Sequence, residues 1–216
     1  MRRLILCSIV LLFAGCSILS KPEAHQVTRY QLGAVASTGA VNAASASSAT
    51  PACNRVLRIQ DVEAAAPYAG DSLMYSDSPQ VLSSFAWHRW ATTPATMLTA
   101  DLLSTVSGAN LYRSVLGPTD PGQADFLLAV RINEGPVQVF STDKSGNKQS
   151  VERLSYTATL TDAGTGAVVG THDFSASRKA SPNPYGGVKA ADAMVRKLNT
   201  DMLSWLSSLS QGAACR

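Results

Sequence analysis

The sequence of 216 residues contains little of what catalysis requires. Its three histidines, His25, His88 and His172, lie far apart and have no metal-ligand spacing. No serine occupies a Gly-x-Ser-x-Gly elbow, and the segment 144–148 lacks the spacing of a phosphate-binding loop. The carboxylates form no recognisable acid/base pair. We therefore predict that the protein is not an enzyme and holds neither a metal nor a dissociable cofactor.

An excess of charge of one sign is also missing. The 18 lysines and arginines include Arg2 and Arg3, and the other 16 nearly balance the 15 aspartates and glutamates. Nucleic-acid binding needs a basic face, and a charge-driven lipid headgroup patch needs a basic cluster. The sequence shows neither, so we exclude nucleic acid as a partner and expect no headgroup patch.

The long apolar run Leu4–Phe13 is about half as long as a membrane-spanning helix. Together with the basic residues before it, this run is typical of a secretory signal, which we place at residues 1–15. Ala14, Gly15 and Cys16 then resemble the bacterial lipobox. On that resemblance Cys16 is the lipidation site, with a diacylglycerol on its sulfur and an acyl chain on its amine, and it anchors a lipoprotein in a membrane. The alternative is an ordinary signal peptide with a chance cysteine.

Two of the four cysteines remain once Cys7 has left with the signal and Cys16 carries lipid. Cys53 and Cys215 form an even pair in an exported protein, where disulfides persist. We predict that they form a disulfide, which closes nearly the whole folded chain into one loop. Free or metal-binding thiols are the alternative, although the sequence offers no Cys-x-x-Cys motif and no histidine partner.

Residues 16–52 are predicted to lie largely outside the folded core. A short polar tether follows the lipidated cysteine and leads to a hint of a strand near residues 30–33. The stretch 36–52 is then rich in Ala, Ser, Thr and Gly and has almost nothing to bury. Residues 53–216 have the length and apolar content of a single domain.

Hydrophobic periodicity predicts an α+β domain with a mainly antiparallel sheet, one face of which is covered by two helices. Thr92 or Thr93 is the expected N-cap of a helix over 94–107, and Pro182 to Gly187 are expected to form a break before the last helix. Strands are predicted at 56–62, 73–76, 81–90, 126–132, 154–160 and 168–176, with turns at 143–147 and 162–166.

The long C-terminal helix has the clearest pattern. Apolar residues recur at steps of three and four from Val188 to Leu209, which gives a single stripe along about six turns. We expect this stripe to pack on the sheet. A helix–helix seam in a homo-oligomer is the alternative.

The segment before the first predicted helix concentrates large flat side chains. It contains Phe85, Trp87, His88, Arg89 and Trp90. An arginine against an aromatic face contributes about 0.5–2 kcal/mol. We regard these five residues as a candidate partner-binding surface, for a protein or for a lipid. The alternative is that the tryptophans seal the helix against the sheet.

Several short stretches, taken in order, carry a family resemblance. They are Cys16, Tyr30–Leu32, Val56–Ile59, Leu73–Tyr75, His88–Ala91 with Pro94, Met97–Leu98 and the long C-terminal helix. This order resembles the ABC-type transport auxiliary lipoprotein family over essentially the whole mature chain. Phe85 and Trp87 depart from the more tyrosine-rich surroundings expected there, and the stretch 36–52 is unusually long.

The resemblance implies a non-catalytic auxiliary or docking component of an ABC-type lipid transport system. The implied partners are an MCE-domain protein and the transporter's permease and ATPase, which move lipids between the inner and outer membranes of Gram-negative cells. Ser17 is not the aspartate that typically retains lipoproteins in the inner membrane, so we expect an outer-membrane anchor and a domain that faces the periplasm. The alternative function is an outer-membrane lipoprotein that carries a lipid or small ligand in its own pocket.

Overall fold

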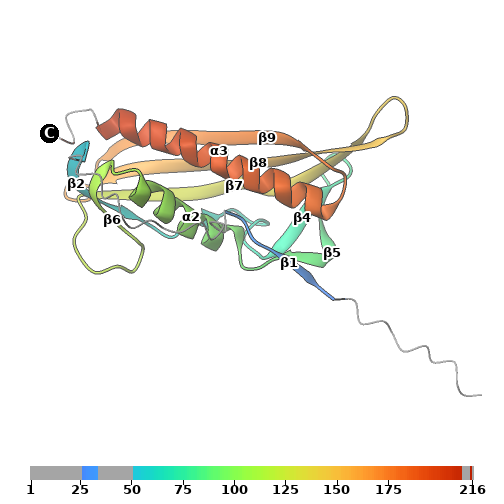
Figure 1. Ribbon diagram of the computed structural model, residues 1–216, viewed down its shortest axis with the longest axis horizontal. Coiled ribbons are helices and arrows are strands. Elements are labelled where there is room, and N and C mark those ends of the chain that lie inside the picture. The colour runs from blue at the N-terminus through green and yellow to red at the C-terminus, as the bar shows by residue number, and fades with distance from the viewer. Residues whose placement is uncertain (1–25, 34–50, 211–214, 216) are drawn as a thin grey trace, which may run out of the picture.

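The computed structural model describes residues 26–33, 51–210 and 215 (Figure 1). The predicted signal peptide, Cys16 and most of the stretch 36–52 lie outside the described residues. In chain order the elements are β1 (Thr28–Tyr30), β2 (Cys53–Ile59), β3 (Glu63–Ala64), β4 (Ser72–Ser76), β5 (Ser83–Trp90), α2 (Pro94–Gly108), β6 (Tyr112–Leu116), β7 (Phe126–Thr142), β8 (Lys148–Asp162), β9 (Val168–Ala180) and α3 (Pro184–Ser210).

The sheet is built on β7. Along one edge, β7 pairs antiparallel with β8 over almost its whole length, and β8 pairs antiparallel with β9. The other edge of β7 is shared by three shorter strands, all parallel to it. These are β2 at Phe126–Leu128, β3 at Arg131–Ile132 and β4 at Val137–Val139.

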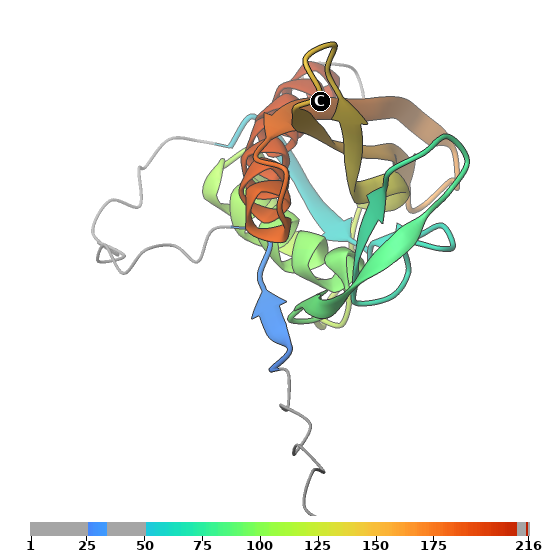
Figure 2. The same ribbon diagram turned by 90° about the vertical axis from the view of Figure 1, so that its right-hand side faces the viewer.

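Two groups of strands therefore extend the sheet from the same edge of β7. We call β2 and β6 the disulfide wing, because Cys53 begins β2 and is bonded to Cys215. We call β4, β5 and β1 the tether wing, because β1 is the first described strand after the region of Cys16. Figure 1 shows the two wings at opposite ends of an elongated domain, and Figure 2 looks onto the end that carries the tether wing.

Both helices cover the same face of the sheet. α2 leads from the tether wing to the disulfide wing, and α3 lies along β9, β8 and β7 (Figure 1). Thr93 is the N-cap of α2, because its Oγ1 accepts a hydrogen bond from the backbone N–H of Thr96 at 3.2 Å. The apolar stripe of α3 packs on the sheet, and Ala191 and Met202 in it are fully buried. The stripe thus serves packing within the domain.

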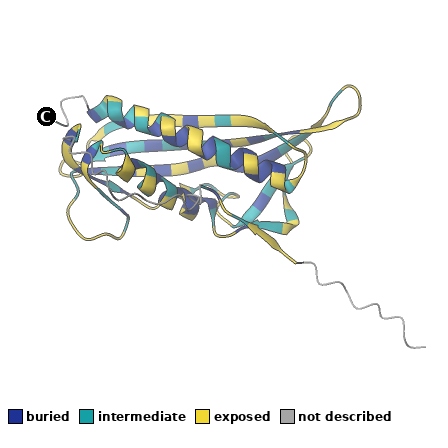
Figure 3. Ribbon diagram, in the orientation of Figure 1, coloured by how far each residue is buried: buried dark blue, intermediate teal, exposed yellow. Residues whose placement is uncertain are grey.

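Alternation of side chains along the strands builds the core under the helices. Leu128 faces Leu160 and Val130 faces Ala158 across the β7–β8 ladder, and each is at most 2% exposed. Figure 3 shows buried positions alternating with exposed or half-exposed positions along β8 and the first half of β7. Burial of apolar area at about 25 cal/mol per Å² is the main stabilising contribution here. The sheet has one apolar and one polar face, as expected for a sheet covered on one side.

The predicted α+β class is confirmed, and the sheet is mixed. The long ladders are antiparallel, whereas the wings join β7 through parallel pairs. The helix over 94–107 is confirmed as α2, and the turns at 143–147 and 162–166 connect the three long strands. The sequence pattern gives no prediction of β6, a strand at the end of the sheet path in which Arg113 and Ser114 are exposed.

The predicted break over Pro182–Gly187 is wrong in its second half. α3 already begins at Pro184, so both glycines lie near its start, inside the helix. A Cβ at Gly187 would lie 2.8 Å from Oε1 of Gln138 and 2.9 Å from Oε2 of Glu152. Glycine is therefore used here for the close approach of the helix to the sheet.

The disulfide joins the first long strand to the far end of the described chain. The Cα atoms of Cys53 and Cys215 are 5.0 Å apart and 162 residues apart in sequence. Cys53 itself is fully buried in the main core. A cross-link over so long a loop strongly restricts the unfolded chain.

Candidate interaction surface at the tether wing

The five candidate residues lie on β5, which stands between β1 and β4 in the tether wing (Figure 2). The pairing of β4 with β5 shifts along its length. Ser72 lies opposite Arg89, but Met74 lies opposite Ser84, so β5 contributes more residues than β4 between these points. Such a bulge bends the strand, and the aromatic residues of β5 no longer follow simple alternation.

Trp90 is buried. Its side chain is 1% exposed and packs in a cluster with Leu32, Leu73, Met97 and Val188. Its indole N–H has no hydrogen-bond partner among the described residues. Trp90 therefore does not belong to an exposed surface and is not available to a partner. Trp90 packs α2 and α3 against the tether wing, which agrees with the alternative that the tryptophans serve packing rather than partner binding.

His88 and Arg89 are half-buried and make contacts within the wing. Tyr30 Oη and His88 Nδ1 are 3.0 Å apart, and the two rings stack. Arg89 donates a hydrogen bond to Asp71 Oδ1 at 3.4 Å, and Arg29 on β1 donates to Asp71 Oδ2 at the same distance. These contacts hold β1 against β5 and the start of β4.

Phe85 and Trp87 have different surroundings. Trp87 is 48% exposed, whereas Phe85 is half-buried. The ring centroids of Phe85 and Tyr75 are 4.6 Å apart, and Phe140 lies edge-on to both. These three rings and Lys148 line a pocket of about 500 Å³ beside the start of α3. Tyr75 and Phe140 are members of this site that sequence reasoning missed.

A buried carboxyl group lies beneath the aromatic pocket. Glu152 on β8 pairs with Gln138 on β7, and the two residues are 3% and 1% exposed. Burial raises the pKa of Glu152 to about 9, so its carboxyl is neutral near neutral pH. Gln138 donates to Ser150 Oγ and to the carbonyl of Ser181. Oε1 of Gln138 and Oε2 of Glu152 have no partner among the described residues.

A raised pKa beside a pocket is a common property of functional sites. Here the small void that Glu152 lines with Phe85 and Gly187 has no room for a water molecule. The carboxyl therefore faces protein rather than a ligand, and its arrangement is structural.

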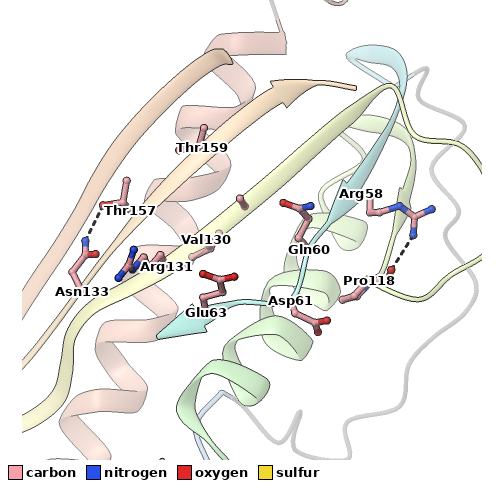
Figure 4. A pocket seen from close by; sticks show the side chains of 11 residues that line it. Arg58, Gln60, Asp61, Glu63, Pro118, Val130, Arg131, Asn133, Thr157 and Thr159 are labelled. Carbon is pink, nitrogen blue, oxygen red and sulfur yellow. Dashed lines mark hydrogen bonds between the residues drawn. The ribbon is translucent and has the colours of Figure 1, made fainter. Parts of the chain in front are cut away.

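The largest hollow lies on the helix-free face of the sheet (Figure 4). It measures about 710 Å³ and is lined by polar side chains that include Arg58, Arg131 and Thr157. The guanidinium of Arg58 donates to backbone carbonyls of the loop 117–122 at 2.8–3.3 Å. Asn133 donates to Thr157 Oγ1 at 2.8 Å. Thr157 in turn donates to Asp173 Oδ1, so these side chains hold a loop and a ladder in place.

Metal-ligand clusters and membrane-spanning helices were sought among the described residues. Within residues 26–33, 51–210 and 215, no group of three histidine, cysteine or acidic side chains could hold a metal ion. None of the helices in those ranges is long and apolar enough to cross a membrane.

Residues 30–203 match the family model of the ABC-type transport auxiliary lipoprotein component. The chain belongs to this family. The matched region runs from the end of β1 to the last turns of α3, so it includes the core and both wings. A search of curated proteins finds no significant match.

Solved structures share the fold. Protein XCC0632 from Xanthomonas campestris has a TM-score of 0.66 and 15% identity, over 87% of this chain and 95% of that chain. The crystal structure of an uncharacterized protein has a TM-score of 0.56 and 15% identity, over 85% of this chain and 99% of that chain. At this identity the likeness concerns the fold alone.

The structure thus brings together only part of the predicted surface. Phe85 joins an aromatic pocket, His88 and Arg89 fasten β1, and Trp90 lies in the core. Trp87 is the exposed member of the five. Cys16, the predicted lipidation site, lies outside the described residues.

Proposed function

We propose that the protein is a non-catalytic, lipid-anchored auxiliary component of an ABC-type transport system in which an MCE-domain partner carries lipids between the inner and outer membranes. One observation carries this proposal, namely the family match over residues 30–203. The arrangement of the pockets supports it. Polar side chains that line the large hollow make hydrogen bonds within the domain, and Glu152 faces protein.

Cys16 provides the attachment in this proposal. Acyl chains on its sulfur and amine would bury many methylene groups at roughly 0.8 kcal/mol each, which holds a protein on a membrane for long times. Ser17 favours sorting to the outer membrane, from which the domain faces the periplasm and the permease–ATPase complex across it.

Affinity isolation of the acylated protein from detergent-solubilised envelopes tests the role. We expect an MCE-domain protein, a permease and an ATPase to be recovered with it. The matched control is Cys16→Ser, which leaves the described domain intact but lowers recovery, because the domain is no longer concentrated at the membrane. Recovery of bulk outer-membrane proteins alone contradicts the proposal.

A second candidate function is favoured by the aromatic pocket of Tyr75, Phe85 and Phe140. Its volume of about 500 Å³ lies within the range of small-ligand sites, and a bound lipid tail could lie against the three rings. Native mass spectrometry distinguishes the two functions. Stoichiometric lipid that is lost in Phe140→Ser supports cargo binding, and an empty wild-type domain supports docking.

A further inference from the structure

Exposed apolar side chains gather at the end of the domain that carries the tether wing. Five large hydrophobic residues are exposed among the described residues, and Val27, Val81, Trp87 and Tyr185 are four of them. They belong to the entry into β1, the β4–β5 connection, β5 and the start of α3, elements that lie at the end turned to the viewer in Figure 2. Val168, the fifth, begins β9 at the opposite end (Figure 1).

Basic residues that are scattered in the sequence meet at the same end. They come from the β7–β8 hairpin, the last residues of β9 and the first turns of α3, and they are Lys144, Lys148, Arg178, Lys179 and Lys189. None of them forms an ion pair with a described carboxylate. Asp143 in the hairpin accepts hydrogen bonds from Ser145, Asn147 and Gln149, so it serves the turn. The fold therefore brings to one end of the domain basic residues that are scattered in the sequence, with Arg178 and Lys179 on opposite faces of β9 and Asp77 lining the same pocket as Lys148.

The path of the chain keeps this end close to the anchor. Thr28 begins β1 only about a dozen residues after Cys16, which is at most about 40 Å when fully extended and roughly 20 Å for a flexible chain. β1 is fastened to the domain, since Leu32 is 7% exposed and its backbone N–H donates to Met97 Sδ at 3.2 Å. The nearest surface to the anchored leaflet is therefore the tether wing.

We propose that this end of the domain rests on the anionic phospholipid surface of the leaflet that holds Cys16. The inference rests on the proposed lipid anchor. Trp87 and Tyr185 lie at the level of the headgroups, where amphipathic rings are favoured, and the five cations face lipid phosphates. Trp87 then meets lipid rather than a protein partner. The disulfide wing points into the periplasm, where a transporter component can reach it.

Spin labels on the full-length acylated protein test this placement. The labels are attached at Tyr185→Cys and, as the matched control, at Val168→Cys, and the protein is reconstituted into vesicles of phosphatidylethanolamine and phosphatidylglycerol. We expect the label at 185 to be several-fold less accessible than the label at 168 to a water-soluble paramagnetic reagent, and more accessible to oxygen. Equal accessibility at the two positions overturns the proposal, as does protection at 185 that begins only when an MCE-domain protein is added.

Charge variants distinguish contact of this end of the domain with the phospholipid surface from attachment through Cys16 alone. One triple variant combines Lys144→Gln, Lys148→Gln and Lys179→Gln. It should raise the accessibility of the label at 185 to the water-soluble reagent toward that of the label at 168. The control variant combines Arg113→Gln, Arg131→Gln and Lys197→Gln, which remove the same number of charges elsewhere. It should leave the accessibility of the label at 185 unchanged. Equal effects of the two triple variants contradict the proposal. The vesicles contain no transporter component. A negative result in this test therefore leaves the result of the affinity isolation open, and the reverse also holds.

Discussion

The two wings extend the same edge of one long strand, yet they are built differently. The disulfide wing belongs to the main core, where Cys53, Leu57 and Phe126 are at most 2% exposed and a cross-link closes the structure. The tether wing has a separate, smaller apolar cluster around Trp90, to which Leu32 contributes from the far side of the stretch 36–52. It also carries the exposed Trp87 and adjoins the buried pair Glu152 and Gln138.

This difference assigns separate tasks to the two ends. A covalent bond and a continuous core stabilise the disulfide wing, together with the hydrogen bonds of Arg58 to the loop 117–122. The tether wing is held by half-exposed ion pairs, one small cluster and a short strand, so its stability is local and its surface is left for contact. The predictions below compare changes in the two wings and in the sheet that joins them.

Removal of the disulfide should have the largest destabilising effect. In Cys53→Ala with Cys215→Ala, we expect the free energy of unfolding to fall by about 4 kcal/mol, because the unfolded chain regains the freedom of a long loop. Denaturant titration measures the change. Reductant should destabilise the wild type by a similar amount and leave the variant unaffected. A wild type that is indifferent to reductant would falsify this account of the disulfide wing.

Leu32→Ala should loosen the tether wing by about 2–3 kcal/mol through loss of a buried side chain. We expect faster hydrogen exchange in β1 and β5 and little change in β2. Leu57→Ala, the matched change in the disulfide wing, should instead accelerate exchange throughout the domain, since Leu57 belongs to the main core. Identical exchange patterns in the two variants would mean that the wings are not separate units.

Glu152→Gln should remove a pH dependence of stability. The carboxyl has a pKa of 4.5 in its ordinary state and about 9 in the fold, so between these values the folded state holds a proton that the unfolded state releases. Each unit of rising pH then lowers the free energy of unfolding by up to about 1.4 kcal/mol. The contribution is complete below about pH 4.5 and is lost as the pH rises toward 9.

Unfolding in urea at about pH 5 and about pH 8 checks this expectation. The variant should be more stable than the wild type at the higher pH, and the two should converge at the lower pH. Some slope should remain in the variant, because burial also raises the pKa of Asp101. Glu134→Gln, on the same sheet and paired with Arg153, is the control and should keep the wild-type slope. Parallel wild-type and Glu152→Gln curves would contradict a buried neutral acid.

Arg89→Gln should have the smallest effect. The ion pair of Arg89 and Asp71 spans 3.4 Å, and both side chains are more than a third exposed, so we expect a loss of less than about 1 kcal/mol. Arg55→Gln removes a pair of 3.5 Å in the disulfide wing and should cost a similar amount. Only Arg89→Gln should speed exchange in β1, because Asp71 also holds Arg29 there. A loss of several kcal/mol from either variant would contradict this view of exposed pairs.

Local patterns were sufficient to predict the two helices and part of each long strand, because β7 and β8 extend well beyond the predicted 126–132 and 154–160. The stripe from Val188 to Leu209 and the alternation from Leu154 to Leu160 reflect burial on one side, which repeats with the period of the element. The same alternation, continued toward the start of β8, places Glu152 on the inward face. That signal could have revealed the buried carboxyl from the sequence.

The tether wing could not be predicted in the same way. Strand alternation places Trp87 and Trp90, three residues apart, on opposite faces of β5, but the local sequence does not indicate which of the two faces is buried. The pocket of Tyr75, Phe85 and Phe140 draws on three strands that are separated in the chain, so no local spacing indicates it. The residues that line this pocket depend on which strands pair with the edge of β7.

The parallel pairing of β1 with β5 has a mechanical consequence. Three residues of β1 pair with His88, Arg89 and Trp90, and the chain continues from the start of β1 toward Cys16. A pull on the domain away from its anchor runs along the strand and loads these hydrogen bonds together, in shear, rather than one after another as in unzipping. A short strand in this orientation resists tension along the chain better than its length suggests.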